Sequence, residues 1–271
     1  MDGMQSQKDV SRLFFGAEVE APWPTELPPG RIIQEENRHL TFAFLGNCSL
    51  SALKNHLSSL PMPHFSITPI GRCDRLLLLP EKEPRVVSYH VLWMTKQVEL
   101  DFFQRGLKSW LKEKGYPVDS RDSLSHITLA REPFDEKEWK EAFFPLPLML
   151  KKIHLYESVG NLCYTPVWTH ALSLAFEELD HTADIAFCIR GEDLFQLHLH
   201  AHIALSFKFP PFLSYWTPTS PQSLSLLVRD LNRSIALADQ QEGCPFKAVS
   251  LHGDIMETAQ NRLEWEMIVD V

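Results

Sequence analysis

Two short stretches of the chain carry the same pattern, a histidine and a threonine separated by one residue. The first is His39 and Thr41 in the run HLTFAFLG. The second is His126 and Thr128 in the run SHITLAR, 87 residues further along. Both runs are apolar and typical of β-strands, in which side chains alternate between two faces. Each histidine should therefore share a face with its threonine, and we expect the two strands to present two imidazoles and two hydroxyls to one cleft.

The same alternation predicts which residues lie on the opposite, buried face of each strand. In the first strand these are Leu40, Phe42 and Phe44, and in the second they are Ile127 and Leu129. A single H-x-T has a plainer interpretation, namely a polar face on a half-buried strand. The second copy, in a second strand-like run, favours a shared site.

Two imidazoles at one site suit an in-line displacement at phosphorus. One histidine can take a proton from the nucleophile while the other gives a proton to the leaving oxygen. Because the ordinary pKa of imidazole lies near neutrality, both proton transfers can proceed without a metal ion or another cofactor.

With their flanking residues, both stretches resemble the paired motifs of the 2H phosphoesterase family, and most closely its RNA 2′,3′-cyclic phosphodiesterase branch. Residues 12–17 (RLFFGA) resemble that family's opening strand. Residues 153–158 (IHLYES) and 164–166 (YTP) resemble its closing strand and loop, so the resemblance covers about residues 10–173. It implies an enzyme that hydrolyses RNA 2′,3′-cyclic phosphate ends to 2′-phosphomonoesters. It also implies an α+β, bilobal fold in which the two H-x-T strands face each other.

The resemblance further implies a role for each polar residue. His39 would be the general acid, and His126 the general base that activates water. Thr41 and Thr128 would donate hydrogen bonds to the phosphate oxygens on which charge develops in the transition state. Arg131 would add a charge-assisted contact to the same phosphate.

The sequence leaves three further points open. Arg38 and Arg121 are additional candidates for phosphate binding, although a solvated surface arginine is the simpler interpretation of each. An aromatic side chain should stack on the RNA base, but no residue is singled out. The direction of the reaction, hydrolysis or 2′–5′ ligation, is also open.

The composition describes a soluble globular protein without a membrane segment. The 271 residues are 44% hydrophobic and 23% charged, and no run approaches the roughly 20 apolar residues of a membrane span. The N-terminal residues lack the apolar core of a secretory signal, and the five cysteines contain no C-x-x-C pair. These features favour the reducing cytoplasm, and we expect a monomer.

The charge is divided unevenly along the chain. Residues 1–174 carry 20 Lys and Arg against 21 Asp and Glu, whereas residues 175–271 carry 6 against 14. No basic stretch dominates, which argues against binding of long duplexes through their phosphate backbone. A site for a single RNA end needs only a few local cations, and the acidic second part favours a protein surface or a cation site.

Periodicity predicts an α+β order of elements over the first 174 residues. Helices are expected at residues 51–60, 98–114 and 135–143, the second of them with an apolar stripe at helical spacing. Strands are expected at residues 10–19, 38–46, 65–70, 75–79, 86–94, 125–131 and 148–156. The two halves of this order each centre on one H-x-T strand, which predicts a domain of two similar lobes.

The pattern restarts near residues 169–175, and we place a boundary between a domain of residues 1–174 and a second domain of residues 175–271. Residues 176–185 (FEELDHTADI) resemble the opening of archease, a small α+β protein that assists the RNA ligase of tRNA splicing. Further similar stretches are 227–232, 247–252 and 268–271. The resemblance implies an RNA-splicing ligase as partner and tRNA halves as the RNA.

In archease a cation ties the end of the chain to the start of the domain. The matching positions here are Asp184 and Asp270, with the carbonyl of Val271 nearby. Hard oxygen ligands suit Ca²⁺ or Mg²⁺, so the resemblance implies a metal-binding site at these three residues. It also supports an alternative function, a non-catalytic accessory protein that binds RNA ends and activates the splicing ligase.

A third candidate cluster comprises His198, His200 and His202. On a strand these residues would share one face and could bind a metal ion. The flanking apolar residues recur at helical spacing, however, and on a helix His200 faces away from the other two. We therefore predict a helix here and no metal site.

Overall fold

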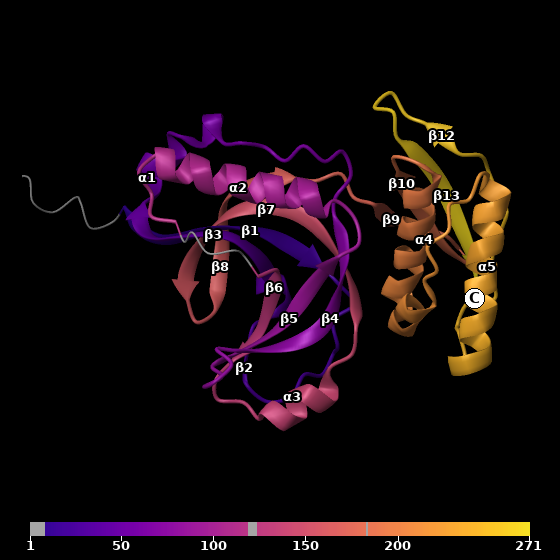
Figure 1. Cartoon of the computed structure of the whole chain (residues 1–271), viewed down its shortest axis with the longest axis horizontal. Helices are drawn as coiled ribbons and strands as arrows, with labels where there is room; N and C mark the ends of the chain where they lie inside the picture. Colours follow the sequence, from indigo (N-terminus) through magenta and orange to yellow (C-terminus); the bar gives the residue numbers. More distant parts are fainter. Residues whose placement is uncertain (1–8, 119–123, 183) are drawn as a thin grey trace, which may run out of the picture.

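The structure is a computed structural model that describes residues 9–118, 124–182 and 184–271. Two β-sheets lie side by side, each with its own helices (Figure 1). The first sheet has eight strands: β1 (Val10–Glu20), β2 (Arg31–Ile32), β3 (His39–Ser49), β4 (Ile70–Leu79), β5 (Val86–Trp93), β6 (His126–Arg131), β7 (Leu146–Gly160) and β8 (Cys163–Ala171). Its helices are α1 (Leu50–Lys54), α2 (Gln97–Glu113) and α3 (Glu136–Ala142), with 3-10 turns η1 (Glu35–Asn37) and η2 (Leu57–Ser59).

The first sheet closes on itself. Its strands follow in the order β1, β3, β6, β5, β4, β7, all antiparallel, and β7 also pairs with β1. Closure removes the exposed edges that an open sheet would present. The two lobes expected from the sequence are therefore parts of one closed sheet. The motif strands β3 and β6, expected to face each other across a cleft, are instead hydrogen-bonded neighbours.

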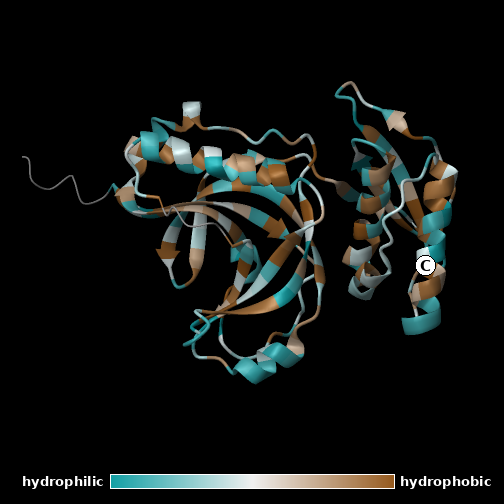
Figure 2. Ribbon diagram, viewed as in Figure 1, coloured by the Kyte–Doolittle hydropathy of each residue, from teal (hydrophilic) through white to brown (hydrophobic). Residues whose placement is uncertain are grey.

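The first sheet and its helices share one hydrophobic core. Hydrophobic residues are accordingly frequent along the strands (Figure 2). α2 packs on β3, and Nε2 of Gln104 donates a hydrogen bond to the carbonyl oxygen of Phe42 at 3.0 Å. The helix and apolar stripe expected at residues 98–114 are confirmed. The buried residues of α2 are Leu100, Phe103, Leu107, Trp110 and Leu111.

Two local expectations are wrong. Residues 65–69 are not a strand, because β4 begins only at Ile70. Pro69 lacks a backbone donor directly before β4, Pro61 and Pro63 precede the segment, and Ile67 is buried in a second core. The expected helix at residues 51–60 is divided into α1 and the turn η2.

The second sheet has the order β11, β13, β10, β9, with β12 beside β13. Its elements are β9 (Phe176–Leu179), β10 (Ile185–Gly191), α4 (Leu194–Lys208), η3 (Pro210–Tyr215), α5 (Leu224–Glu242), β11 (Ala248–Val249), β12 (Met256–Glu257) and β13 (Leu263–Asp270). The chain passes from the first sheet to the second at residues 172–175. Among the described residues, no helix is both long enough and apolar enough to cross a membrane.

α4 lies at the junction of the two sheets. It packs on β10 and β13 of its own sheet and also contacts β7 of the first sheet. Ile67, Ile70 and Met149 of the first part of the chain join the hydrophobic core around α4. This enclosure explains why α4 is buried continuously from residue 197 to residue 206.

The three neighbouring histidines lie on α4, so the helix predicted there is confirmed. Each contacts a different partner: Thr219 for His198, the carbonyl oxygen of Arg190 for His200, and that of Phe212 for His202. Within the described parts of the chain, no group of three or more His, Cys, Asp or Glu residues is arranged to hold a metal ion. Burial lowers the pKa of His198 and His200 to about 4 and that of His202 to about 3.

We predict that the core around α4 loses stability in mild acid. The unfolded chain takes up protons on these imidazoles as the pH falls through about 6.5, whereas the folded chain keeps them neutral down to about pH 4. The stabilisation is therefore complete above pH 6.5 and is lost progressively below it. Hydrogen exchange of the α4 amides at pH 7 and pH 5 measures the loss.

A histidine variant tests whether these imidazoles cause the pH dependence. His202→Gln removes one of the titrating groups, so the slope of the opening free energy should fall by about 1.4 kcal/mol per pH unit in this range. An opening free energy in the wild-type chain that does not change between pH 7 and pH 5 would contradict the prediction.

Candidate active site

The two H-x-T motifs lie on neighbouring antiparallel strands. One residue pair, Leu40 of β3 with Ile127 of β6, joins them in the ladder. Because the pairing is antiparallel, each motif histidine lies opposite the threonine of the other strand, His39 opposite Thr128 and His126 opposite Thr41. The polar residues that flank this pair are all half-buried and form what we call the motif face: His39, Thr41, His126 and Thr128.

Both motif strands show the same burial pattern over six residues. From His39 and from His126 it runs half-buried, buried, half-buried, buried, buried, exposed. Two consecutive buried residues break the alternation of a regular strand, and in each case a β-bulge is the cause. The ladder between β3 and β1 skips Phe42, and the ladder between β6 and β5 skips Leu129. Such an extra residue moves the following side chains to the other face.

The bulges decide which further side chains reach the motif face. Strict alternation predicts Phe44 on the buried face, and this prediction is wrong, since Phe44 is 45% exposed. Arg131 occupies the equivalent position in β6, three residues after the motif threonine. Its positive charge contributes to lowering the pKa of His39, after burial and the charge of His126.

The two histidines are held in the same way. Nδ1 of His39 lies 2.8 Å from the carbonyl oxygen of Asn37, and Nδ1 of His126 lies 2.7 Å from that of Leu124. A carbonyl oxygen only accepts hydrogen bonds, so in each ring Nδ1 carries the proton. Each imidazole is thus fixed by the backbone two residues before it, and Nε2 is the nitrogen left for proton transfer.

His39 is surrounded by aromatic rings. The ring centroids of Phe14, Tyr164 and Tyr156 lie 4.7, 4.8 and 5.5 Å from its own. Burial lowers the pKa of His39 to about 4, the hydrogen bond to the backbone opposes this shift, and the nearby charges add to it. The ring is therefore neutral at neutral pH. A general base must be neutral when it accepts a proton, so this state bears on which of the two histidines acts as the base.

β5 brings further polar groups to the second motif strand. Oγ of Ser88 donates to Oγ1 of Thr128 at 3.4 Å. His90 is the ladder partner of His126, and its Nδ1 lies 2.5 Å from Oδ1 of Asp74. Nothing in the sequence marks Ser88 or His90, because only the pairing of β5 with β6 brings them to this site.

Two arginines face each other beside the motif face. Arg131 of β6 pairs with Arg31 of β2 across the ladder. Like charges at directly opposed positions destabilise a sheet, and a bound anion between them would offset their repulsion. Arg31 is therefore a second candidate phosphate ligand, for which the sequence gives no signal.

Arg38 and Arg121 are the two further sequence-based candidates for phosphate binding. Arg38 is buried, so the interpretation of a solvated surface arginine is wrong. Its Nε donates to the carbonyl oxygen of Ile33 at 3.1 Å, and its guanidinium lies 4.9 Å from the ring centroid of Trp23. Arg121 lies outside the described residues.

The residues expected to hold a cation lie at the ends of β10 and β13. The register of these strands places Asp184 beside Asp270. The carbonyl oxygen of Val271, however, accepts a hydrogen bond from Nζ of Lys247 at 2.5 Å. A lysine ammonium at that oxygen competes with a metal ion, so the arrangement does not fit a divalent cation held by all three residues.

No protein-family model and no curated protein matches the chain. Among solved structures, E. coli LigT complexed with 3′-AMP matches at 24% identity over 60% of this chain and 99% of that one, with a TM-score of 0.46. A structure described as a phosphoesterase matches at 25% identity over 60% and 98%, with a TM-score of 0.44. The protein TT0787 of Thermus thermophilus matches at 18% identity over 59% and 97%, with a TM-score of 0.45.

Gly16 supports the motif face from β1, where it pairs with Thr41. A Cβ atom at Gly16 would lie 2.7 Å from the carbonyl oxygen of Leu40 and 3.5 Å from Cδ2 of His39. The close contact is with backbone, so β3 must move to accommodate it. We predict that Gly16→Ala costs about 1–3 kcal/mol of stability and shifts the NMR signals of the His39 ring.

Gly106 of α2 provides the matched control, since a Cβ there meets nothing within 4 Å. Gly106→Ala should leave the His39 signals unchanged and raise the thermal midpoint slightly, because alanine favours the helix. Unperturbed His39 signals in Gly16→Ala would show that β1 does not position the motif.

Proposed function

We propose that the chain hydrolyses RNA ends carrying a 2′,3′-cyclic phosphodiester and releases 2′-phosphomonoesters. The proposal rests mainly on a pair of imidazoles on one face. In each, Nδ1 is hydrogen-bonded to a backbone carbonyl and Nε2 is available for proton transfer. Two such groups can act as base and acid on the two sides of a reacting phosphorus. The substrate class comes from the resemblance of the H-x-T stretches to 2H phosphoesterases.

In the proposed reaction, Nε2 of one histidine takes a proton from water as the water oxygen attacks phosphorus. The bond between phosphorus and the 3′ oxygen breaks, and that oxygen takes a proton from Nε2 of the other histidine. The product carries a 2′-phosphate and a 3′-hydroxyl, and proton exchange with solvent restores both rings. Each positioned acid or base contributes on the order of 10²- to 10⁴-fold in rate.

The surroundings of His39 favour the role of base for this residue. Its lowered pKa keeps the ring neutral in the free protein. A neutral ring with its proton on Nδ1 can accept a proton at Nε2 but has none there to give. We therefore assign His39 as the base and His126 as the acid, which reverses the assignment that the sequence resemblance implies.

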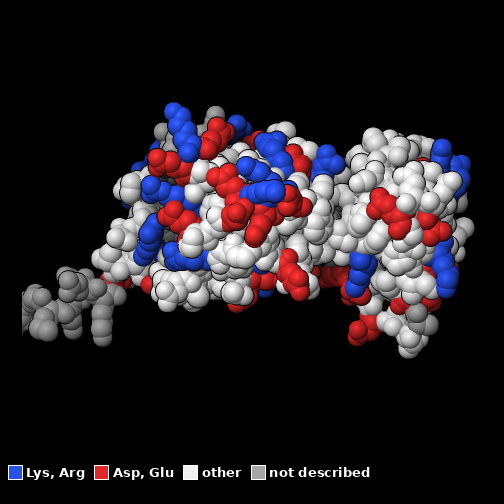
Figure 3. All heavy atoms as spheres, turned by 90° about the horizontal axis from the view of Figure 1, so that it is seen from below, with Lys and Arg blue, Asp and Glu red and all other residues white. Residues whose placement is uncertain are grey.

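The remaining polar groups stabilise the negative charge of the phosphate. The hydroxyls of Thr41 and Thr128 donate to its non-bridging oxygens, and Arg131 and Arg31 supply positive charge beside them. Acidic and basic side chains are interspersed on the face of the molecule shown in Figure 3. This distribution supports recognition of one RNA end rather than a long stretch of duplex.

The first prediction for this function concerns the histidines and metal ions. His39→Ala and His126→Ala should each lower kcat at least on the order of 10²-fold on an oligonucleotide with a 2′,3′-cyclic phosphate end. Wild-type protein should keep its activity in EDTA and give a 2′-phosphate, identified by chromatography against 2′- and 3′-phosphate standards, because the two isomers have the same mass. His252→Ala, at an exposed position of the second part, is the control. Near-normal turnover by either motif variant, or loss in EDTA that Zn²⁺ restores, would refute the mechanism.

The second prediction separates the roles of the two histidines. A p-nitrophenyl phosphodiester has a leaving group that departs without a proton, so it does not need the acid. His126→Ala should therefore lose much less rate on this substrate than on the cyclic phosphate, whereas His39→Ala should lose a similar factor on both. The opposite pattern would identify His39 as the acid.

The pH dependence gives a third prediction. Since the base must be neutral, kcat/KM of the wild-type protein should fall as the pH drops through about 4, the pKa of His39 in the free protein. His39→Gln should remove this acid limb from the residual activity. An acid limb centred near pH 6.5 in the wild type would show that His39 is not the group that titrates.

The partnership with an RNA-splicing ligase stays a prediction that rests on the sequence of residues 175–271 alone.

A further inference from the structure

Phe44 is an exposed aromatic ring that the bulge in β3 brings to the motif face. One side of the ring stacks on Phe14, with centroids 5.3 Å apart and the planes 18° from parallel. The guanidinium of Arg12 lies 5.7 Å from the centroid of the Phe44 ring. Phe14 itself is fully buried, so Phe44 rests on a fixed support while 45% of its surface meets solvent.

This ring lies within reach of the reacting groups. Phe44 follows Thr41 by three residues, which in a strand is about 10 Å. Phe14 contacts both Phe44 and His39, whose ring centroid is 4.7 Å from that of Phe14. A continuous series of aromatic contacts therefore runs from the half-buried imidazole of His39 through the buried ring of Phe14 to the exposed ring of Phe44.

We propose that Phe44 and Arg12 bind the nucleobase of the terminal nucleotide, an inference that rests on the proposed function and deepens it. RNA bases stack on aromatic side chains and on the planes of arginine guanidinium groups. The guanidinium of Arg12, which lies over the Phe44 ring in the free protein, would move outward to admit the base between itself and Phe44, and would then contact the outer side or the edge of the base. Stacking of this kind requires only a π-face, so the site accepts all four bases and binds purines, with their larger rings, more tightly than pyrimidines.

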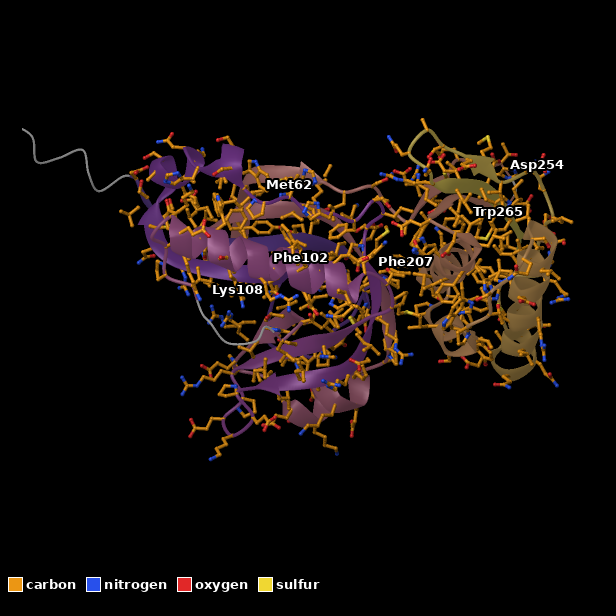
Figure 4. All side chains as sticks on the ribbon, turned by 45° about the horizontal axis from the view of Figure 1, so that its top comes forward. Met62, Phe102, Lys108, Phe207, Asp254 and Trp265 are labelled. Atoms are coloured by element: carbon orange, nitrogen blue, oxygen red, sulfur yellow. The ribbon has the colours of Figure 1, made fainter. Side chains whose placement is uncertain are left out.

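Exposure alone would not distinguish Phe44 from other apolar residues at the surface. Phe102 on α2, labelled in Figure 4, is 59% exposed. Its ring neighbour is His64, with centroids 6.3 Å apart and planes 47° from parallel. Phe44 combines exposure with a stacked support, a cation over its ring and a direct aromatic connection to His39. Phe102→Leu is consequently the matched control for the same substitution at Phe44.

The experiment measures binding of adenosine 2′-monophosphate by calorimetry to wild-type protein and to Phe44→Leu, Phe44→Trp and Phe102→Leu. Stacking on one aromatic side chain is worth about 1–3 kcal/mol, so Phe44→Leu should weaken binding by about 5-fold or more. Phe44→Trp should bind at least as tightly as wild type, and Phe102→Leu should match it. Glycerol 2-phosphate, which has no base, should bind wild type and Phe44→Leu equally.

The possible results are distinguishable. The base site is overturned if wild type does not bind adenosine 2′-monophosphate at millimolar concentration, if Phe44→Leu binds it normally, or if Phe44→Leu loses affinity for both ligands equally. Hydrolysis of adenosine 2′,3′-cyclic phosphate, followed in parallel, tests the proposed function separately. Binding that depends on Phe44 without any hydrolysis would support the base site and contradict the phosphodiesterase activity.

Discussion

In each motif histidine, Nδ1–H donates a hydrogen bond to the carbonyl oxygen two residues before it. This bond fixes the direction of the ring and also determines that Nε2 is the nitrogen that exchanges protons. For His39 the carbonyl belongs to Asn37, whose side-chain oxygen in turn accepts a hydrogen bond from the backbone N–H of Tyr164 at 2.8 Å. The turn η1 and strand β8 are thereby tied to the orientation of one imidazole.

The closed sheet makes the two motifs geometrically equivalent, and the residues after them make the site asymmetric. Pairing of Leu40 with Ile127 relates the two strands, and each has a bulge directly after its threonine. The side chain that the bulge exposes is Phe44 in one strand and Arg131 in the other. One end of the motif face is consequently aromatic and the other cationic, which corresponds to the base and the phosphate of a nucleotide.

The sequence predicts features that depend on local periodicity. α2 is recognised from its apolar stripe, and the sharing of a face by His39 and Thr41 follows from the two-residue repeat of a strand. The bulges have no such signal, because an extra residue in one strand is defined only by its partner strand. Alternation alone therefore puts Phe44 on the wrong face. Closure of the sheet cannot be predicted from local periodicity either, because it depends on pairing between strands that are far apart in the sequence.

The pKa of His39 also depends on residues that are far from it in the sequence. His39 is half-buried because Phe14, Tyr156 and Tyr164 come to it from β1, β7 and β8, and this burial sets which proton-transfer role the ring can take. The same limit applies to Ser88 and Arg31, which strand pairing brings beside the motif. No pattern in the neighbouring sequence could reveal either residue.

The orientation of the two imidazoles can be measured directly by ¹⁵N NMR of histidine-labelled protein at a pH where both rings are neutral. The chemical shifts of the ring nitrogens identify which one carries the proton. Both His39 and His126 are predicted to be protonated at Nδ1, with Nε2 unprotonated, and each Nδ1 proton should be protected from exchange by its carbonyl partner. A neutral ring protonated at Nε2 in either residue would contradict the arrangement on which the proposed catalysis depends.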